Sequence, residues 1–314
     1  MNILITGAAG FVGRQLVRRV LFEYPNATSI TCVDLNCSAL PSSPNLRIVN
    51  GSLVEAAVFA DVFNCPMDLV FHMATIPGGW AEENFELGTR VNLMLTYRIL
   101  EALRCQHSAP RFIFTSSIGV FGHLDGPVDD DTVPRPTWSY GTHKAIGELL
   151  TADYTRKGFI DGRVIRLPGL VARPPDPSGA ISAFLSDLIR VLGAGQDFVC
   201  PVSAASTCWW MSRHRAVENI LHAAAVSTDV FPPQRVYTLP ALHCSIASVV
   251  DAIGMVTGQN TRDLVIYRPN SEVEERFGKL PPLNVPRAES CGFRSDGTIE
   301  AMVRCALQGL SDGQ

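Results

Sequence analysis

Residues 2–13 read Asn-Ile-Leu-Ile-Thr-Gly-Ala-Ala-Gly-Phe-Val-Gly, a short apolar run followed by three spaced glycines. The run up to Thr6 is typical of a buried strand, and the residues after Gly13 have the pattern of a helix. In such a strand–turn–helix unit, Gly7 permits the tight turn and Gly10 lets a phosphate approach the backbone, while Gly13 lets the helix pack closely on the strand. The stretch therefore predicts a phosphate-binding turn at a helix N-terminus, where N–H groups and the helix dipole favour negative charge.

An acidic residue follows at about the separation that such a turn requires. Asp34 comes directly after the next apolar run, residues 29–33, where a carboxylate can accept hydrogen bonds from the adenosine ribose hydroxyls of a dinucleotide. The same carboxylate would repel a 2′-phosphate, and Leu35 and Asn36 supply no cation to hold one. The residues favour NAD over NADP, with a simple strand-end cap as the alternative role of Asp34.

The first half of the chain alternates short β-branched runs with longer helical patterns, as a parallel sheet with crossover helices requires. The apolar runs lack strict alternation and so predict strands buried on both faces. We expect strands over residues 2–6, 29–33, 46–50, 69–72, 112–115 and 163–167, and helices over residues 12–24, 85–105 and 140–157. Within residues 85–105, helical spacing predicts one buried stripe, made by Leu87, Val91, Met94 and Tyr97. The predicted fold class is α/β, a doubly wound parallel sheet of the Rossmann type with a small C-terminal substrate lobe.

The pattern changes after Pro168, where a proline-rich stretch and shorter runs begin. We expect an NAD-binding Rossmann domain over residues 1–168. A substrate lobe should follow over residues 169–314, with residues 216–240 returning to the Rossmann sheet. Substrate is expected in the crevice at the carboxyl ends of the strands, between the two lobes.

Two further stretches carry groups that can move a proton. The fifth expected strand ends in Thr115-Ser116-Ser117, and Tyr140 and Lys144 lie four residues apart on one face of the next helix. A lysine cation stabilises a nearby phenolate, so the tyrosine can take the proton of a secondary alcohol while a nicotinamide takes the hydride. Tyr-x-x-x-Lys is common on helix surfaces. It gains weight here because it follows a dinucleotide fingerprint and a Ser-Ser strand end, and because no Gly-x-Ser-x-Gly turn points to a serine hydrolase.

Composition argues against several other classes of protein. The net charge of −4 and pI near 6.0 give no reason to expect nucleic acid or an anionic membrane as a partner. No apolar run reaches the roughly 18 residues that a membrane span needs. The nine cysteines are scattered without a Cys-x-x-Cys pair, which predicts reduced thiols and no metal site. With a core strand starting at residue 2, these features predict a cytoplasmic protein that acts on a small molecule.

Four of these motifs together resemble the extended, or atypical, short-chain dehydrogenase/reductases of the NAD-dependent epimerase/dehydratase superfamily. They are residues 6–13, His72-Met73-Ala74, Thr115-Ser116-Ser117 and residues 140–144. The resemblance implies that Ser117 is the catalytic hydroxyl, Tyr140 the proton donor and acceptor, and Lys144 the catalytic lysine. It also implies cofactor contacts from Gly7, Gly10, Phe11, Val12, Gly13, Asp34, Ser52, Leu53, Met73, Ala74, Asn92, Thr115, Tyr140, Lys144 and Pro168.

Longer stretches are similar to the D-erythronate dehydrogenase group of that superfamily, namely residues 84–88, 90–92, 139–150 and 165–168. The similarity implies oxidation of the C2 hydroxyl of a short sugar acid to the 2-keto acid, with NAD. The chain departs from that group at Thr207-Cys208-Trp209-Trp210, where the group tends to have Arg-His-Trp-His. Nucleotide-sugar epimerases usually place a diphosphate-binding arginine at this point, so Thr207 argues against a nucleotide-sugar substrate.

We expect substrate contacts from the loop after the fourth strand, from the Ser-Ser strand end and from the second lobe: Thr75, Trp80, Ser116, Ser117, Arg173, Ser178 and Trp210. The alternatives are that the tryptophans are core residues and that Arg173 is a surface arginine in a proline-rich loop. His72 is expected to be packed and hydrogen-bonded, and His143 to point to a different face from Tyr140 and Lys144.

Three alternatives to a hydroxy-acid dehydrogenase stay open at this point. They are a nucleotide-sugar epimerase or dehydratase that keeps its NAD bound, a reductase of bulkier ketones, and a non-catalytic NAD sensor. The complete set of Ser117, Tyr140 and Lys144 argues against the sensor. The resemblance also implies a homodimer through the helices at residues 85–105 and 140–157, packed as a four-helix bundle.

Overall fold

The computed structural model describes residues 1–175 and 181–311, and the chain divides into two compact units. Unit 1 contains residues 1–122, 134–166 and 220–237. Unit 2 contains residues 123–133, residues 167–219 and the chain from residue 238 onward. Residues 123–133, which lie inside the first domain expected from the sequence, thus belong to unit 2.

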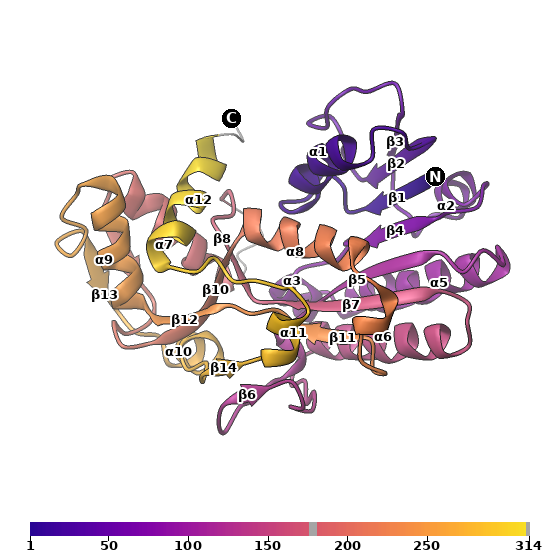
Figure 1. The fold of residues 1–314 in the computed structure, drawn as a ribbon. Helices are drawn as coiled ribbons and strands as arrows, with labels where there is room; N and C mark the ends of the chain where they lie inside the picture. The colour runs from indigo at the N-terminus through magenta and orange to yellow at the C-terminus, as the bar shows by residue number, and fades with distance from the viewer. Residues whose placement is uncertain (176–180, 312–314) are drawn as a thin grey trace. The chain divides into compact units, whose positions relative to one another are not determined.

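Unit 1 is built on a seven-stranded sheet (Figure 1). In their order across the sheet the strands are β11 (Val236–Thr238), β7 (Asp161–Leu167), β5 (Arg111–Ser117), β4 (Leu69–His72), β1 (Asn2–Thr6), β2 (Ser29–Asp34) and β3 (Leu46–Asn50). Within this order, each strand from β5 through β4, β1 and β2 to β3 pairs in parallel with the next one. The strand order reverses between β1 and β4, which is the switch point of a doubly wound fold, so the predicted fold class is confirmed.

Both faces of this sheet are buried. On one face, Leu4, Val70 and Phe112 belong to a single hydrophobic cluster with residues of α2 (Ala56–Val62) and α5 (Leu95–Cys105). On the other face, Ile5 and its sheet partner Phe71 are fully buried as well. Strands covered on both sides read as continuous apolar runs, which is the pattern that the sequence shows.

The long helix expected over residues 85–105 is interrupted. It consists of α4 (Phe85–Gly88), a π-helical segment η1 (Thr89–Met94) and α5. The predicted buried stripe is wrong, because Met94 and Tyr97 are 47% and 42% exposed. A π turn advances less per residue than an α turn, so it shifts the helix face, and the buried residues are Asn92, Leu95, Thr96, Ile99, Leu100 and Leu103.

The remaining elements of unit 1 are helices and short helical turns. Helix α6 (Ser139–Arg156) packs against β5 and α5 (Figure 1). The others are α1 (Gly13–Glu23), α3 (Gly78–Glu83), the short η2 (Ile118–Val120) and η4 (Thr228–Val230), and the C-terminal part of α8 (Arg213–Ala225).

Unit 2 has its own hydrophobic core and three small sheets. Its strands are β6 (Val128–Asp129), β8 (Gly169–Val171), β9 (Phe198–Cys200), β10 (Thr207–Ser212), β12 (Leu242–Ser245), β13 (Val265–Tyr267) and β14 (Leu283–Asn284), paired as β12-β10-β8, β13-β9 and β14-β6. Its helices are η3 (Ile181–Ala183), α7 (Phe184–Gly193), the start of α8, α9 (Ile246–Thr257), α10 (Ser271–Phe277), α11 (Pro286–Ser290) and α12 (Ile299–Ser311). Its core cluster is formed largely by side chains of α7, α9 and α12 with those of β8 and β10.

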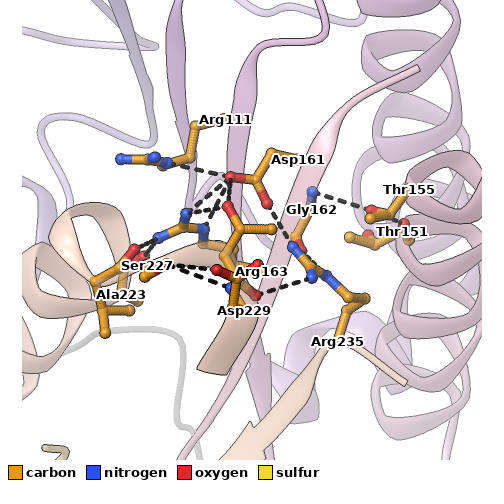
Figure 2. Close-up of polar contacts among 12 residues, drawn as sticks. Arg111, Thr151, Thr155, Asp161, Gly162, Arg163, Ala223, Ser227, Asp229 and Arg235 are labelled. Carbon is orange, nitrogen blue, oxygen red and sulfur yellow. Dashed lines mark hydrogen bonds and ion pairs between the residues drawn. The ribbon is translucent and has the colours of Figure 1, made fainter. Parts of the chain in front are cut away.

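A charged cluster ties α8 and β11 to the amino ends of β5 and β7 (Figure 2). Arg163, whose side chain is fully buried, binds the Asp161 carboxylate and donates to the Ala223 carbonyl over 2.7 Å. Arg111 and Arg235 bind the same carboxylate from either side. The last carbonyls of a helix have no partner within it, so Arg163 and Arg111, which donate to the carbonyls of Ala223 and Ala224, complete the C-terminus of α8.

Candidate active site

The turn after β1 is shaped by its glycines. Gly7 has φ +68°, a left-handed conformation that favours glycine. A Cβ on Gly13 would lie 2.1 Å from the Gly7 oxygen, so a larger residue cannot bring α1 this close to the turn. A Cβ on Gly10 would meet, among the described residues, only that same oxygen, at 3.2 Å. The turn therefore leaves room for another group at Gly10.

The start of α1 suits an anion. Val12 provides no side-chain cap, and the first turn of the helix contains no acidic residue. The backbone N–H groups and the dipole at such an end favour a negatively charged partner. The glycine turn and this helix end together fit the pyrophosphate of NAD, with Phe11 and Val12 half-buried beside them.

Asp34 lies at the end of β2, beside this turn. Its carboxylate accepts from the N–H of Ala9 at 2.9 Å and from its neighbour Leu35 at 2.7 Å, and it remains partly exposed. Two backbone donors hold the carboxylate in place and leave it lone pairs for the ribose hydroxyls. Leu35 is 72% exposed and carries no charge, as the preference for NAD requires.

The loop after β3 has a mixed character. Ser52 is half-buried, and its hydroxyl accepts from the N–H of Val54 at 3.3 Å. Leu53 is buried in the hydrophobic cluster that also contains Leu4 and Val33. Leu53 is thus chiefly a core residue, and its contact with a cofactor stays a prediction.

A buried hydrogen-bond network links the ends of β1 and β4. The Thr6 hydroxyl lies 2.8 Å from Nδ1 of His72, and Nε2 of the same ring lies 3.0 Å from the Thr96 hydroxyl. Because Thr96 donates to the carbonyl of Asn92, it accepts from His72, which places the ring proton on Nε2. Burial, with the charge of Lys144, lowers the pKa of His72 to about 3, so the ring is neutral. His72 is therefore the packed, hydrogen-bonded residue that the sequence predicted.

The same network fixes the loop that follows β4. The Thr6 hydroxyl accepts from the N–H groups of Met73 and Ala74, at 3.2 and 3.1 Å. Asn92, in the π-helical segment, is buried and binds Ile76 twice: its Oδ1 accepts from the N–H at 2.7 Å, and its Nδ2 donates to the carbonyl at 3.1 Å. The Thr75 hydroxyl also lies 3.0 Å from Asn92 Oδ1. Asn92 thus holds the loop that contains three of the predicted contact residues, Met73, Ala74 and Thr75.

The three residues predicted to be catalytic come together where α6 packs against the end of β5. Nζ of Lys144 lies 5.7 Å from the centre of the Tyr140 ring and donates to the Thr115 carbonyl over 2.8 Å. The Ser117 hydroxyl accepts from the N–H of Gly119 at 3.1 Å, which holds the start of η2. Burial lowers the pKa of Lys144 to about 7, with the charge of Glu148 acting in the opposite direction.

A tryptophan that sequence reasoning missed borders this group. Trp138, which precedes α6, donates from Nε1 to the Gly119 carbonyl over 3.0 Å, and its ring lies 5.6 Å from that of Tyr140. A Cβ on Gly78 would lie 2.3 Å from the indole, so this glycine makes room for it. The position of Trp138, two residues before Tyr140, was the only signal in the sequence that this tryptophan would lie near the site.

Ser116 points away from Ser117, because successive side chains of a strand alternate between faces. It is buried, and its hydroxyl donates to Glu148, which in turn forms a bidentate ion pair with Arg166. The expected substrate contact of Ser116 is thus corrected, since its hydroxyl is used inside the protein. Glu148 lies four residues after Lys144, a spacing that places the two side chains close together on one helix face. Nothing in the sequence indicated that Arg166 would be the ion-pair partner of Glu148.

The other residues predicted to contact substrate differ in their exposure and in the unit to which they belong. Trp80, on α3, is 42% exposed. Trp210 is fully buried in the core of unit 2, with Nε1 donating to the Cys244 carbonyl, so its expected substrate contact is corrected to the core alternative. Arg173 and the buried Pro168 belong to unit 2, and Ser178 lies outside the described residues.

His143, which lies in sequence between the two predicted catalytic residues Tyr140 and Lys144, is buried and faces α4 and η1. Its Nε2 lies 3.4 Å from the Thr89 hydroxyl, and its ring lies 6.3 Å from Phe85. It faces η1 and α4, so the structure agrees with the prediction that it points away from Tyr140 and Lys144.

The described part of the chain lacks the features of two other classes of site. In residues 1–175 and 181–311, His, Cys, Asp and Glu side chains form no group of three or more that could hold a metal ion. Over the same residues, no helix combines the length and apolar character needed to cross a membrane.

The chain is similar to known proteins in family, sequence and structure. The model of the NAD dependent epimerase/dehydratase family matches residues 3–229. D-erythronate dehydrogenase of Cupriavidus necator is 37% identical over 318 residues, which cover 98% of each chain. D-erythronate dehydrogenase of Haemophilus influenzae is 30% identical over 97% of this chain and 98% of the relative.

The solved structures agree with this placement. The nucleoside-diphosphate-sugar epimerase from Agrobacterium tumefaciens superposes with a TM-score of 0.91 at 31% identity, covering 100% of this chain and 95% of that chain. An L-threonine dehydrogenase from Phytophthora infestans, at 22% identity and a TM-score of 0.85, shares the fold. The chain belongs to the NAD-dependent epimerase/dehydratase family and is an NAD-dependent oxidoreductase that acts on CH–OH groups.

Proposed function

We propose that this enzyme oxidises the C2 hydroxyl of a short sugar acid such as D-erythronate to the 2-keto acid, with Tyr140 as the proton acceptor. The observation that carries the proposal is the placement of Lys144, whose buried amine lies 5.7 Å from the Tyr140 ring and is held by the Thr115 carbonyl. Acceptance of the hydride is the chemistry that NAD supplies when bound.

The protein's own part in this reaction is positioning and proton transfer. A cationic Lys144 stabilises the phenolate form of Tyr140, which lets the phenolate oxygen take the hydroxyl proton of the substrate. Ser117, at the end of β5, is proposed to hold the same substrate oxygen. Gly7, Gly10, Gly13 and Asp34 are proposed to hold NAD as their geometry suggests, together with the other cofactor contacts that the sequence implied.

One residue, Thr207, favours a sugar acid over a nucleotide sugar as the substrate. Thr207 begins β10, and its hydroxyl donates to the Leu280 carbonyl over 2.8 Å. It therefore offers neither a positive charge nor a free hydroxyl for a diphosphate. The two relatives named D-erythronate dehydrogenase extend over nearly the whole chain, which supports the same choice.

We also propose a homodimer through the helices around α5 and α6. Their outer surface leaves large apolar side chains uncovered in the single chain: Phe85 is 64%, Met94 47%, Tyr97 42% and Leu149 72% exposed. Apolar groups on two neighbouring helices are typical of a surface that a second copy covers. Sedimentation velocity of the wild type and of a Met94→Glu/Leu149→Glu variant tests this proposal, because the charges should produce monomers.

The cytoplasm is the proposed compartment. All nine cysteines are free thiols, which is typical of a reducing environment.

The function is tested by NADH formation, followed by absorbance, across short hydroxy acids, sugars, apolar secondary alcohols and nucleotide sugars. We expect turnover of D-erythronate or a close aldonic acid. Tyr140→Phe should lower kcat at least about 100-fold, because the variant lacks the group that takes the proton, while its melting temperature should stay unchanged. Turnover of bulky alcohols alone would keep the mechanism and reject the sugar acid. Conversion of a nucleotide sugar without release of NADH would reject the dehydrogenase proposal.

A further inference from the structure

A buried charged network lies directly behind the proposed catalytic lysine. Arg166, on β7, donates from Nε and from a terminal nitrogen to the two carboxylate oxygens of Glu148, at 2.9 and 2.7 Å. The Ser116 hydroxyl donates to the first of these oxygens. Ser116, Glu148 and Arg166 are 2%, 4% and 7% exposed, so the network is closed to solvent.

Helix α6 holds the end of β5 at two successive points. Lys144 and Glu148 are one turn apart on the helix and are both buried. Lys144 binds the carbonyl of Thr115, and Glu148 binds the hydroxyl of the next residue, Ser116. The strand then ends with Ser117, the proposed catalytic hydroxyl. The carboxylate therefore helps to fix the peptide unit that receives the lysine amine.

Glu148 also acts on Lys144 through its charge. An ammonium group loses its hydration on burial, which lowers the pKa of Lys144 to about 7, and the negative charge of Glu148 opposes that loss. The other titratable groups near the amine are Tyr140 on the same helix and His72 at the end of β4, while Arg166 on β7 binds Glu148. The ring of His72 is neutral, so Glu148 supplies the negative charge that acts on the amine.

We propose that Glu148, held by Arg166 and Ser116, is a positioning residue that keeps Lys144 cationic and in place for the reaction. The proposal rests on the proposed function, because it assigns a purpose to the charge on Lys144. The ordinary alternative is that the pair only stabilises the fold. Buried ion pairs are weak contributors to stability, and an apolar or neutral pair of similar volume often replaces them without loss. The two roles can therefore be separated by experiment.

The test uses the small number of lysines in the chain, which are Lys144, Lys157 and Lys279. Protein labelled with ¹³C in lysine gives three side-chain signals, and a Lys144→Met variant identifies the one from Lys144. Its titration by NMR measures the charge of Lys144 directly, without any substrate. Removing one partner of a buried pair leaves the other uncompensated, so the main variant replaces both, as Glu148→Gln/Arg166→Met.

We expect Lys144 to titrate near pH 7 in the wild type and at least about one pH unit lower in the double variant, because the neutral pair no longer opposes desolvation. Glu148→Asp, which keeps the carboxylate and Arg166, should return the midpoint toward the wild-type value. The matched control is Asp153→Asn/Arg156→Met, an exposed pair on the same helix, which should leave the titration of Lys144 unchanged. A folded double variant with an unchanged Lys144 midpoint would overturn the proposal.

The activity measurement separates this inference from the proposed function. With the best substrate of the panel, kcat at a pH between the two Lys144 midpoints should be lower in the double variant than in the wild type, because only the wild-type lysine is then largely charged and able to stabilise the phenolate. A shifted Lys144 titration with an unchanged pH profile would uphold the electrostatic coupling and reject the catalytic role of Lys144. If the double variant does not fold, Glu148→Gln alone decides the matter, because a folded single variant whose Lys144 midpoint equals that of Asp153→Asn/Arg156→Met would overturn the proposal.

Discussion

Strand β7 carries a buried arginine near each of its ends, and the two have different surroundings. Arg163, near the amino end, binds Asp161 and the carbonyls of Ala223 and Val226 (Figure 2). Arg166, near the carboxyl end, binds Glu148, which in turn reaches the strand end beside the proposed catalytic residues. Two residues of the same type, on one strand, thus belong to two kinds of network.

The difference follows from the direction of the chain in a parallel sheet. All strands of such a sheet begin at one edge and end at the other, and ligands bind at the loops of the carboxyl edge. At the amino edge, the guanidinium of Arg163 is saturated by a carboxylate, a hydroxyl and helix carbonyls. At the carboxyl edge, the partner of Arg166 is shared with α6. We therefore expect changes at the amino edge to affect stability and changes at the carboxyl edge to affect chemistry.

The largest effect on stability should come from Asp161→Ala. This change leaves the fully buried Arg163 without its carboxylate and also removes a partner of Arg111 and Arg235. An uncompensated buried charge costs about 3–5 kcal/mol, so the free energy of unfolding should fall by that amount in a urea titration. At a temperature where the variant is folded, kcat should equal that of the wild type.

The control for this prediction is Asp229→Asn. Asp229 belongs to the same neighbourhood (Figure 2) but is exposed, and its loss should change the unfolding free energy by no more than about 0.5 kcal/mol. A fall in kcat for folded Asp161→Ala would show that the amino edge also affects the chemistry and would remove the distinction between the two ends.

A pair of glycine variants sharpens the account of the carboxyl edge. Gly13→Ala would place a Cβ 2.1 Å from the Gly7 oxygen, and the backbone shift needed to relieve it should cost about 1–3 kcal/mol of stability. Gly10→Ala meets the same oxygen at 3.2 Å, so it should fold almost normally and lose affinity for NAD instead. Thermal unfolding and calorimetric titration with NAD distinguish the two. Equal NAD affinity in wild type and Gly10→Ala would contradict the proposed placement of the phosphates.

The smallest effect concerns the pH dependence of stability. Burial alone would raise the pKa of Asp161, but the hydrogen bonds and charges of Arg163, with Thr228 and Arg235, lower it overall. A group with a lowered folded-state pKa contributes stability above its unfolded pKa, about 3.9, and loses it as the pH falls through the folded value. Unfolding free energies between pH 5 and pH 2 should therefore fall less steeply in Asp161→Asn than in the wild type. Parallel slopes would show that Asp161 does not contribute to acid unfolding.

Much of unit 1 could be predicted because its signals are local. The strands that end at Thr6 and His72 are short apolar runs. The spacing of the glycines from Gly7 to Gly13 indicates the geometry of the turn, because these residues lack a Cβ. Asp34 follows from the same pattern. The Tyr140–Lys144 pair could be found because a spacing of four residues places two side chains on one helix face, whatever the rest of the chain does.

Other features could not be predicted, because they depend on contacts between distant segments. The π turn at Thr89–Met94 shifts the buried face of its helix, so counting from Leu87 gave the wrong stripe. Trp210 was a candidate substrate contact until the packing of α7 and α9 placed it in the core of unit 2. Trp138 depends on the room left by Gly78 of α3 and Gly119 of η2, which are far apart in the sequence.

The sequence by itself determined the fold class and the preference for NAD, and it supplied the pair that we propose to transfer the proton, because each depends on the identity and spacing of residues close together in the chain. Only the tertiary structure decided which buried charges meet. Arg163 and Arg166 are three residues apart on β7, yet one is paired by its own strand neighbour and the other by a helix that begins more than twenty residues earlier in the chain. The free-energy cost of burying a charge depends on which groups lie next to it in space, and the sequence alone does not identify those groups.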